Sequence, residues 1–273
     1  MSFEVPSAHA LDVGPCRYGD SRLLVRGPQR DLDQPFVAAL GSSDTYGKFV
    51  DQPFAARIET ALGMPCVNFG CVNAGVDAFL NDDVILGIAG AAKAVIVQVM
   101  GAQNLSNRFY RVHPRRNDRF LEPTVLLTKI YPEVDFTEFH FNKHMLQFLR
   151  AKSADRFDVI QQELQAAWVG RMKLFLKAIK APVLLAWLRH DASETVEPDF
   201  GADPLFVTRA MLDQIENEIG GLAEIRVQTA RQTGDLYDMK FGPLEAPVAE
   251  QSIGQGMHAK IAETILSAFQ DLK

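Results

Sequence analysis

Hydroxyl, amide and imidazole side chains recur in this sequence just after short apolar runs. The run at 36–40 is followed by GSSDTYG, in which Ser43 stands between two glycines. A serine hydroxyl attacks an acyl carbon when an imidazole takes its proton and amides hold the oxyanion. An imidazole that could do this, His258, opens the last amphipathic stretch of the chain. The pattern predicts acyl transfer at Ser43; the alternative is that Ser43 only binds backbone amides at the start of a helix.

Candidate groups for the oxyanion follow the next two apolar runs. These candidates are Asn73, Gly75, Gln103 and Asn104. The backbone amide of Gly75 or Asn73 and the side chain of Gln103 would hold the oxyanion, together with the amide of the nucleophile. The alternative for Gln103 and Asn104 is that they only fix a loop.

A basic segment, NRFYRVHPRRNDRF at 107–120, follows the third run. It holds five arginines and one aspartate in a chain of net charge −6. Arginine binds carboxylate, sulfate and phosphate oxygens in pairs, and the aromatic rings between could stack on a sugar. We expect six arginines to bind an anionic part of the substrate: Arg108, Arg111, Arg115, Arg116, Arg119 and Arg189. The alternatives are contacts within a homodimer, through the insertion 104–155, or an ordinary solvated surface.

Five apolar runs must position these groups, and we interpret them as strands at 36–40, 64–70, 94–100, 181–188 and 223–229. Periodic stretches between them predict helices at 51–63, 74–91 (in two pieces), 156–180, 205–219 and 258–272. This alternation predicts a three-layer α/β/α domain, 35–273, around a parallel sheet of about five strands. It follows an irregular segment, 1–34, and carries the insertion 104–155, in which we expect one helix near 137–150. Ligands of such sheets bind at the carboxyl ends of the strands, so we expect the candidate residues to converge there.

These motifs resemble those of the SGNH, or GDSL-type, hydrolase superfamily. Its first block, Gly-Asp-Ser followed four residues later by Gly, is similar to GSSDTYG, with Ser43 as the nucleophile. Its second block resembles NFGCVNAG, and its third resembles GAQN, where Gln103 replaces the oxyanion asparagine. The resemblance covers roughly 35–105 and 181–273. It implies a flavodoxin-like sheet and an esterase-type hydrolase or acyltransferase with a Ser43–His258 dyad, acting on an acidic or carbohydrate-linked ester.

The sequence departs from that family at catalytic positions. Ser42 stands in place of the aspartate of the first block, and Gln255 in place of the aspartate three residues before the histidine. Such changes equally suit a catalytically inactive scaffold that binds an anionic glycan or a protein partner. The whole chain also resembles a family of marine alphaproteobacteria linked to polysaccharide biosynthesis or sulfotransfer. A sulfotransferase is therefore a third hypothesis, although GSSDTYG lacks the lysine–serine ending of a phosphate loop.

Two further pairs of residues that contain histidine could support other chemistry. His190 and Asp191 are a possible base and its orienting carboxylate, although sequence neighbours rarely face each other. His140 and His144 are spaced to bind a metal on a helix, but no third ligand is evident. We therefore expect neither a metal nor a cofactor.

Composition limits the remaining possibilities. The chain has 273 residues, 47% of them hydrophobic and 23% charged, which is ordinary for a globular protein. Its acidic net charge disfavours general nucleic-acid binding. Cys16, Cys66 and Cys71 are too few for a disulfide framework, and the last two are best interpreted as buried apolar fillers. We identify no signal peptide, and Lys93 interrupts the longest apolar stretch, so we expect a cytoplasmic protein without a membrane span.

Overall fold

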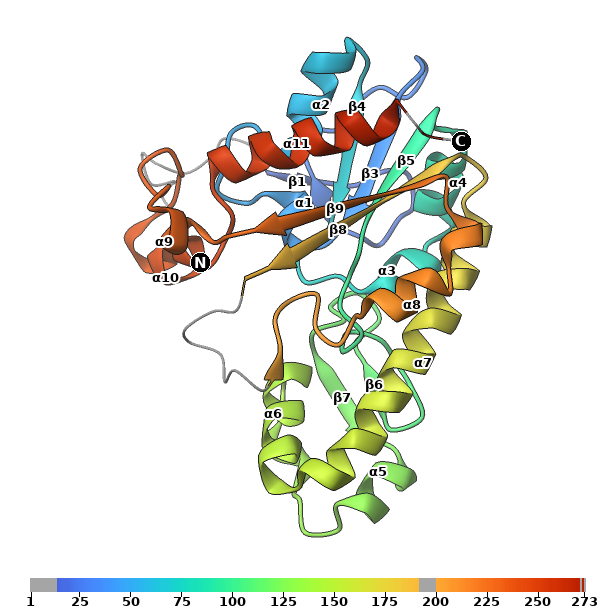
Figure 1. Ribbon diagram of the computed structural model, residues 1–273, viewed down its shortest axis with the longest axis vertical. Helices are drawn as coiled ribbons and strands as arrows, with labels where there is room; N and C mark the ends of the chain where they lie inside the picture. The colour runs from blue at the N-terminus through green and yellow to red at the C-terminus, as the bar shows by residue number, and fades with distance from the viewer. Residues whose placement is uncertain (1–13, 192–199, 271, 273) are drawn as a thin grey trace.

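A parallel sheet of five strands forms the centre of the computed structural model, which describes residues 14–191, 200–270 and 272 (Figure 1). The strands are β3 (Val37–Gly41), β4 (Cys66–Gly70), β5 (Ala94–Gln98), β8 (Val183–His190) and β9 (Gly221–Val227). Their order, β4-β3-β5-β8-β9, is that of flavodoxin-like folds. Every residue of β3 and β5 is buried, because helices cover both faces of the sheet. The predicted fold class is confirmed.

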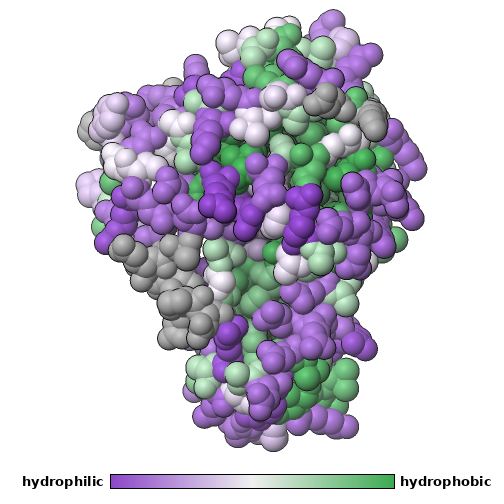
Figure 2. Space-filling model, in the orientation of Figure 1, coloured by the Kyte–Doolittle hydropathy of each residue, from purple (hydrophilic) through white to green (hydrophobic). Residues whose placement is uncertain are grey.

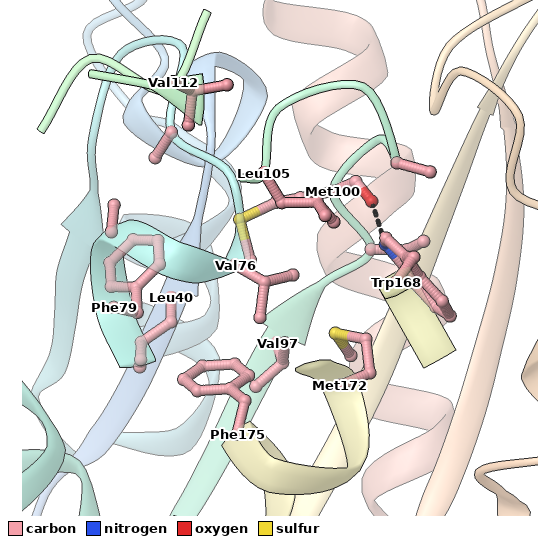
Figure 3. Close-up of a cluster of buried hydrophobic side chains, with 14 of the residues drawn as sticks. Leu40, Val76, Phe79, Val97, Met100, Leu105, Val112, Trp168, Met172 and Phe175 are labelled. Atoms are coloured by element: carbon pink, nitrogen blue, oxygen red, sulfur yellow. Dashed lines mark hydrogen bonds between the residues drawn. The ribbon is translucent and has the colours of Figure 1, made fainter. Parts of the chain in front are cut away.

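Alternate residues of the central strands pack against two helical layers. Ala39 and Ile96 share a cluster with Ile58 of α2 (Phe54–Leu62) and with α11 (Gln255–Phe269). Leu40 and Val97 face the opposite layer, made of α3 (Val76–Leu80), α4 (Asp83–Ala91) and α7 (Ala154–Ala178). Figure 3 shows this second cluster, in which the Trp168 indole donates a hydrogen bond of 2.7 Å to the Met100 carbonyl. Burial on both faces fixes the register of the strands, and with it the position of each strand end.

The insertion after β5 folds into a lobe below the sheet (Figure 1). It contains a hairpin of β6 (Tyr110–Val112) and β7 (Phe120–Pro123), then α5 (Val125–Ile130), a 3₁₀ turn η1 (Phe136–Glu138) and α6 (Asn142–Lys152). The prediction of a single helix here was wrong, because strands of three or four residues are too short to show a period. Buried aromatic rings, among them Tyr110, Tyr131 and Phe136, form the interior of the lobe. Figure 2 shows a narrower waist between sheet and lobe, where hydrophobic residues are visible at the surface.

The remaining segments differ in detail from the predicted elements. The N-terminal segment contains a two-residue ladder of β1 (Pro15–Cys16) and β2 (Val25–Arg26). The helix predicted at 205–219 is only α8 (Arg209–Asp213) with the 3₁₀ turn η3 (Glu216–Glu218). Phe206 has a φ of 65°, which excludes this residue from an α-helix. Between β9 and α11 lie α9 (Ala230–Thr233), η4 (Pro243–Glu245) and α10 (Ala246–Glu250), short elements that the sequence pattern did not predict.

Within the described part of the chain, every helix is too short or too polar to cross a lipid bilayer.

Candidate active site

A pocket of about 1060 Å³ opens at the carboxyl edge of the sheet, and residues at or just after the ends of all five strands line it. Five of the six predicted catalytic and oxyanion residues meet there: Ser43, Asn73, Gln103, Asn104 and His258. The lobe contributes Phe141, Lys143, His144 and Gln147, and the segment before α11 contributes Pro247, Val248, Gln251, Ser252 and Ile253. The expected convergence of strand ends is therefore present, and the contacts within the pocket decide what each residue can do.

The turn that presents Ser43 is fixed by a side chain of the neighbouring strand. α1 (Ser43–Tyr46) follows β3 directly, and its N-cap residue, Ser42, makes no side-chain capping bond. Gln98, the last residue of β5, binds the backbone amides of this turn instead. Its Oε1 accepts hydrogen bonds from the Ser42 amide (2.9 Å), the Thr45 amide (3.2 Å) and the Thr45 hydroxyl (2.6 Å). Gly41 is required beside it, because a Cβ there would lie 2.6 Å from the Gln98 side chain.

The Ser43 hydroxyl is exposed in the pocket and bonded to Asn73. It donates to Asn73 Oδ1 at 3.1 Å, and it accepts from the Asn73 backbone amide, also at 3.1 Å. Asn73 has a φ of 58°, a left-handed conformation that asparagine tolerates better than most residues. Its Nδ2 donates to Asp118 Oδ2 at 3.1 Å, and burial raises the pKa of that aspartate. The predicted oxyanion donor Asn73 is thus the immediate partner of the predicted nucleophile, Ser43.

His258 is the fourth residue of α11 and is fully buried. Its Nδ1 accepts a hydrogen bond of 3.2 Å from the Phe54 amide, at the start of α2, where Pro53 provides no side-chain cap. Burial lowers the pKa of His258 to about 3, so the ring is neutral near pH 7. Because Nδ1 accepts, the ring proton lies on Nε2, which has no partner in the described structure.

The predicted contact between Ser43 and His258 is not formed among the described residues, although both line the pocket. Gln255, in the position of the missing aspartate, accepts a hydrogen bond of 3.0 Å from Arg57 instead. His258 therefore works in this structure as a cap for α2.

The other predicted oxyanion donors are partly engaged. The Gly75 amide donates to Asn117 Oδ1 at 2.9 Å, so it is not available to an oxyanion, and Gly75 is not among the residues lining the pocket. The Gln103 side chain is 8% exposed and turns back over Gly101, and its Oε1 has no hydrogen-bond partner among the described residues. Asn104 Oδ1 accepts from Asn142 Nδ2 at 3.2 Å.

None of the six predicted substrate-binding arginines is among the described residues that line this pocket. Arg108 pairs with Glu163 at 2.6 Å, and Arg111 pairs with Glu122 at 3.6 Å. Arg119 lies 5.2 Å from the ring centroid of Phe141, and Arg115 and Arg116 are exposed. Arg189 pairs with Glu224 and stacks on Trp187. Five of these arginines lie on the segment 107–120, of which only Asp118 lines the pocket, and Arg189 lies on β8. The lysines of the pocket are Lys48 and Lys143.

An ion pair between His190 and Asp44 is the contact in this pocket that the sequence did not reveal. His190 Nε2 lies 2.8 Å from Asp44 Oδ2, with 16% and 18% of the two side chains exposed. Burial opposes the charge on His190, but Asp44 outweighs it and raises the pKa of the imidazole. Burial likewise opposes the charge on Asp44, yet His190 holds the pKa of that carboxyl below its usual value. The alternative pairing of His190 with Asp191 is not observed, since neighbours on a strand point to opposite faces.

A metal site is not evident. In residues 14–191, 200–270 and 272, no cluster of three or more His, Cys, Asp or Glu side chains could hold a metal ion.

Solved structures with a similar course of the chain include a lipase, a lipolytic protein and an esterase. A lipase from a goat rumen metagenome is 11% identical over 86% of this chain and 97% of its own, with a TM-score of 0.40. A protein of Desulfitobacterium hafniense DCB-2, described as belonging to the G-D-S-L lipolytic family, is 15% identical over 85% and 98%, with a TM-score of 0.38. A catalytic mutant of an acetylxylan esterase from Geobacillus stearothermophilus is 15% identical over 85% and 93%, with a TM-score of 0.39. At these values the likeness concerns the fold and not the chemistry.

Comparison with curated proteins gives no match. A family model does match, over residues 1–273, and its description is "Domain of unknown function (DUF6473)".

Proposed function

The chain belongs to the DUF6473 family, and we propose that it is an SGNH-type hydrolase or acyltransferase in which Ser43 attacks the acyl carbon of a carbohydrate-linked ester. The observation that supports this most is the position of Ser43. Its hydroxyl is exposed in the large pocket, just after the end of β3, while Gln98 fixes the turn that presents it. A nucleophile needs such a fixed, accessible position.

The composition of the pocket favours a hydroxyl-rich substrate over a strongly anionic one. Carboxamides, hydroxyls and carboxylates, the groups that bind sugar hydroxyls, dominate its polar lining: Ser42, Asn73, Gln98, Gln103, Asn104, Asp118, Gln147, Asp191, Thr229, Gln251 and Ser252. Four aspartates line the pocket (Asp44, Asp118, Asp191, Asp203), against two lysines. Apolar side chains such as Met100, Phe141 and Leu188 would contact the acyl group. We therefore propose an acylated neutral glycan as the substrate.

The oxyanion would be held by the backbone amides of Ser43 and Asn73 and by the Gln103 side chain, once the acyl group displaces the present contacts. Three imidazoles line the pocket. That of His144, on α6, packs against the Phe139 ring at a centroid distance of 5.2 Å, and the other two could receive the Ser43 proton. His258, which the sequence predicted, must first release the Phe54 amide so that its proton can move to Nδ1. Catalytic hydrogen bonds often form only in the substrate complex, so the absence of a bond in the free protein does not exclude it. His190 is the second imidazole.

Acetate release from a panel of acetylated mono- and oligosaccharides tests the proposal. We expect turnover by the wild type and a loss of about a hundredfold or more in Ser43→Ala. The thermal midpoint should stay unchanged, since the hydroxyl is exposed. Ser267→Ala is the matched control, because Ser267 is exposed on α11 and is not among the described pocket residues. Wild-type turnover in Ser43→Ala would end the nucleophile proposal.

A specific observation also favours a second candidate, an inactive scaffold that binds a glycan or a protein partner. The Ser43 hydroxyl donates to Asn73 Oδ1, and the His258 lone pair is occupied by the Phe54 amide. These contacts are what a site without catalytic function would keep. Calorimetric binding of an acetylated glycan, without acetate release and unaffected by Ser43→Ala, would favour this candidate over the enzyme.

A further inference from the structure

We infer that the His190–Asp44 pair, and not His258, carries the proton in the proposed acyl transfer, an inference that rests on the proposed function. Both side chains line the pocket that contains Ser43. His190 is the last residue of β8, and Asp44 directly follows Ser43 in α1. The two strand ends therefore bring a carboxylate-bound imidazole to the segment that carries the nucleophile.

The geometry of the pair is that of a base and its orienting group. Asp44 Oδ2 binds His190 Nε2 at 2.8 Å, which leaves Nδ1 as the ring nitrogen that exchanges protons. A carboxylate in this position selects the tautomer and stabilises the imidazolium that forms. Asp44 provides this for His190, whereas the structure gives His258 a backbone amide as its partner.

Both members of the pair are held in place relative to Ser43. Asp44 Oδ2 also accepts from Gln98 Nε2 at 3.2 Å, and the Oε1 of the same Gln98 binds the amides of the Ser43 turn. The His190 backbone amide donates to the Asp203 carbonyl at 3.0 Å. One side chain, Gln98, thus sets the positions of the nucleophile and of the carboxylate together.

The charged groups around His190 determine when it is a base. Asp44 on α1 and Asp203, before α8, favour the imidazolium, whereas Lys143 on α6 and burial oppose it. The net effect raises the pKa of His190 above its ordinary value. The neutral form, which accepts a proton, therefore appears as the pH rises through that raised value. If His258 were the base, its pKa of about 3 would leave the rate independent of pH between pH 5 and pH 9.

The proton of Ser43 moves through His190 in both halves of the reaction. As Ser43 Oγ bonds to the acyl carbon, its proton passes to His190 Nδ1. The bond between the acyl carbon and the leaving oxygen breaks, and that oxygen takes the proton from His190. Water, or an acceptor sugar hydroxyl, then attacks the acyl-serine and gives its proton to His190. Ser43 leaves with that proton, and both groups return to their starting state.

The rate of labelling by an alkyl fluorophosphonate tests this inference without knowledge of the substrate. The rate is measured by intact mass from pH 5 to pH 9, on the full chain. We expect the wild-type rate to rise through a pKa above the ordinary histidine value. His190→Gln should label about 10² to 10⁴ times more slowly, the range for loss of a general base. Asp44→Asn should move the rise to lower pH, because the cation loses its partner.

Matched variants separate the possible outcomes. His140→Gln, on the exposed surface of the lobe and not among the described pocket residues, should label as the wild type does. His258→Gln should keep the rise at the wild-type pH. Thermal midpoints show whether each variant is folded, and Asp44→Asn provides the test if His190→Gln is not. Two results would overturn this inference but leave the proposed function standing. They are labelling of His190→Gln at the wild-type rate, and a labelling rate in Asp44→Asn that rises at the same pH as in the wild type. A wild type that is not labelled at any pH would overturn the proposed function together with it.

Discussion

Replacing Gln98 with leucine tests most directly how the fold holds the turn that carries Ser43. Gln98 is 5% exposed, and its Oε1 accepts three hydrogen bonds, two of them from the amides of Ser42 and Thr45. Leucine has nearly the same volume but leaves these donors unpaired. Each buried donor that loses its partner costs about 1–3 kcal/mol, and the Thr45 hydroxyl can rotate to another acceptor. We therefore expect Gln98→Leu to lower the free energy of unfolding by about 3–5 kcal/mol.

Urea unfolding followed by the fluorescence of the buried Trp168 and Trp187 measures this change. Gln98→Glu is the matched variant, since it keeps an acceptor oxygen but places a carboxyl beside Asp44 Oδ2. Its stability should approach the wild-type value at low pH, where the introduced carboxyl is protonated, and fall as the pH rises and the two carboxylates repel. If Gln98→Leu lowers the free energy of unfolding by less than about 1 kcal/mol, a change of the size that surface substitutions cause, Gln98 does not hold the turn in place.

Two further predictions concern the packing around the pocket. Burial lowers the pKa of His258 to about 3, so the unfolded chain binds a proton between about pH 6.5 and 3 that the folded chain does not. The free energy of unfolding of the wild type should therefore fall by about 3 kcal/mol more between pH 7 and pH 4 than that of His258→Gln. Urea unfolding at both pH values measures this, and an equal fall in the two proteins would contradict it. Gly75→Ala should destabilise by about 2–3 kcal/mol, because a Cβ would overlap the Asn104 carbonyl. Gly87→Ala, in open space on α4, should instead stabilise the protein by about 0.5–1 kcal/mol. Equal thermal midpoints for the two variants would contradict this prediction, because they would mean that the backbone at Asn104 shifts to make room for the methyl group.

The main elements of the sheet domain could be predicted because local sequence determines them. The run AVIVQ of β5 is β-branched and uncharged, as a strand covered on both faces must be. The break in the helix predicted at 74–91 is real, since the Asp82 side chain caps α4 by accepting from the Ile85 amide at 3.0 Å. The lobe could not be predicted in the same way. Its short strands and turns depend on aromatic side chains that meet only after folding.

The candidate site could be predicted only as a location. Strand ends of a parallel sheet meet at one edge, so Ser43 and His258 were expected in one pocket, and both line it. Their hydrogen-bond partners could not be predicted, because Asp44 and His190 are 146 residues apart, and Phe54 and His258 are 204 apart. Such pairs depend on tertiary packing, which leaves no local pattern. The motif GSSDTYG contained Asp44, but nothing in its spacing indicated an imidazole partner.

Peptide mapping of the fluorophosphonate adduct is the most direct test of Ser43 as the nucleophile. We expect one adduct, on the peptide that contains Ser43, and its loss in Ser43→Ala. Modification of a different residue, or a folded protein that binds acetylated glycans yet forms no adduct, would contradict it.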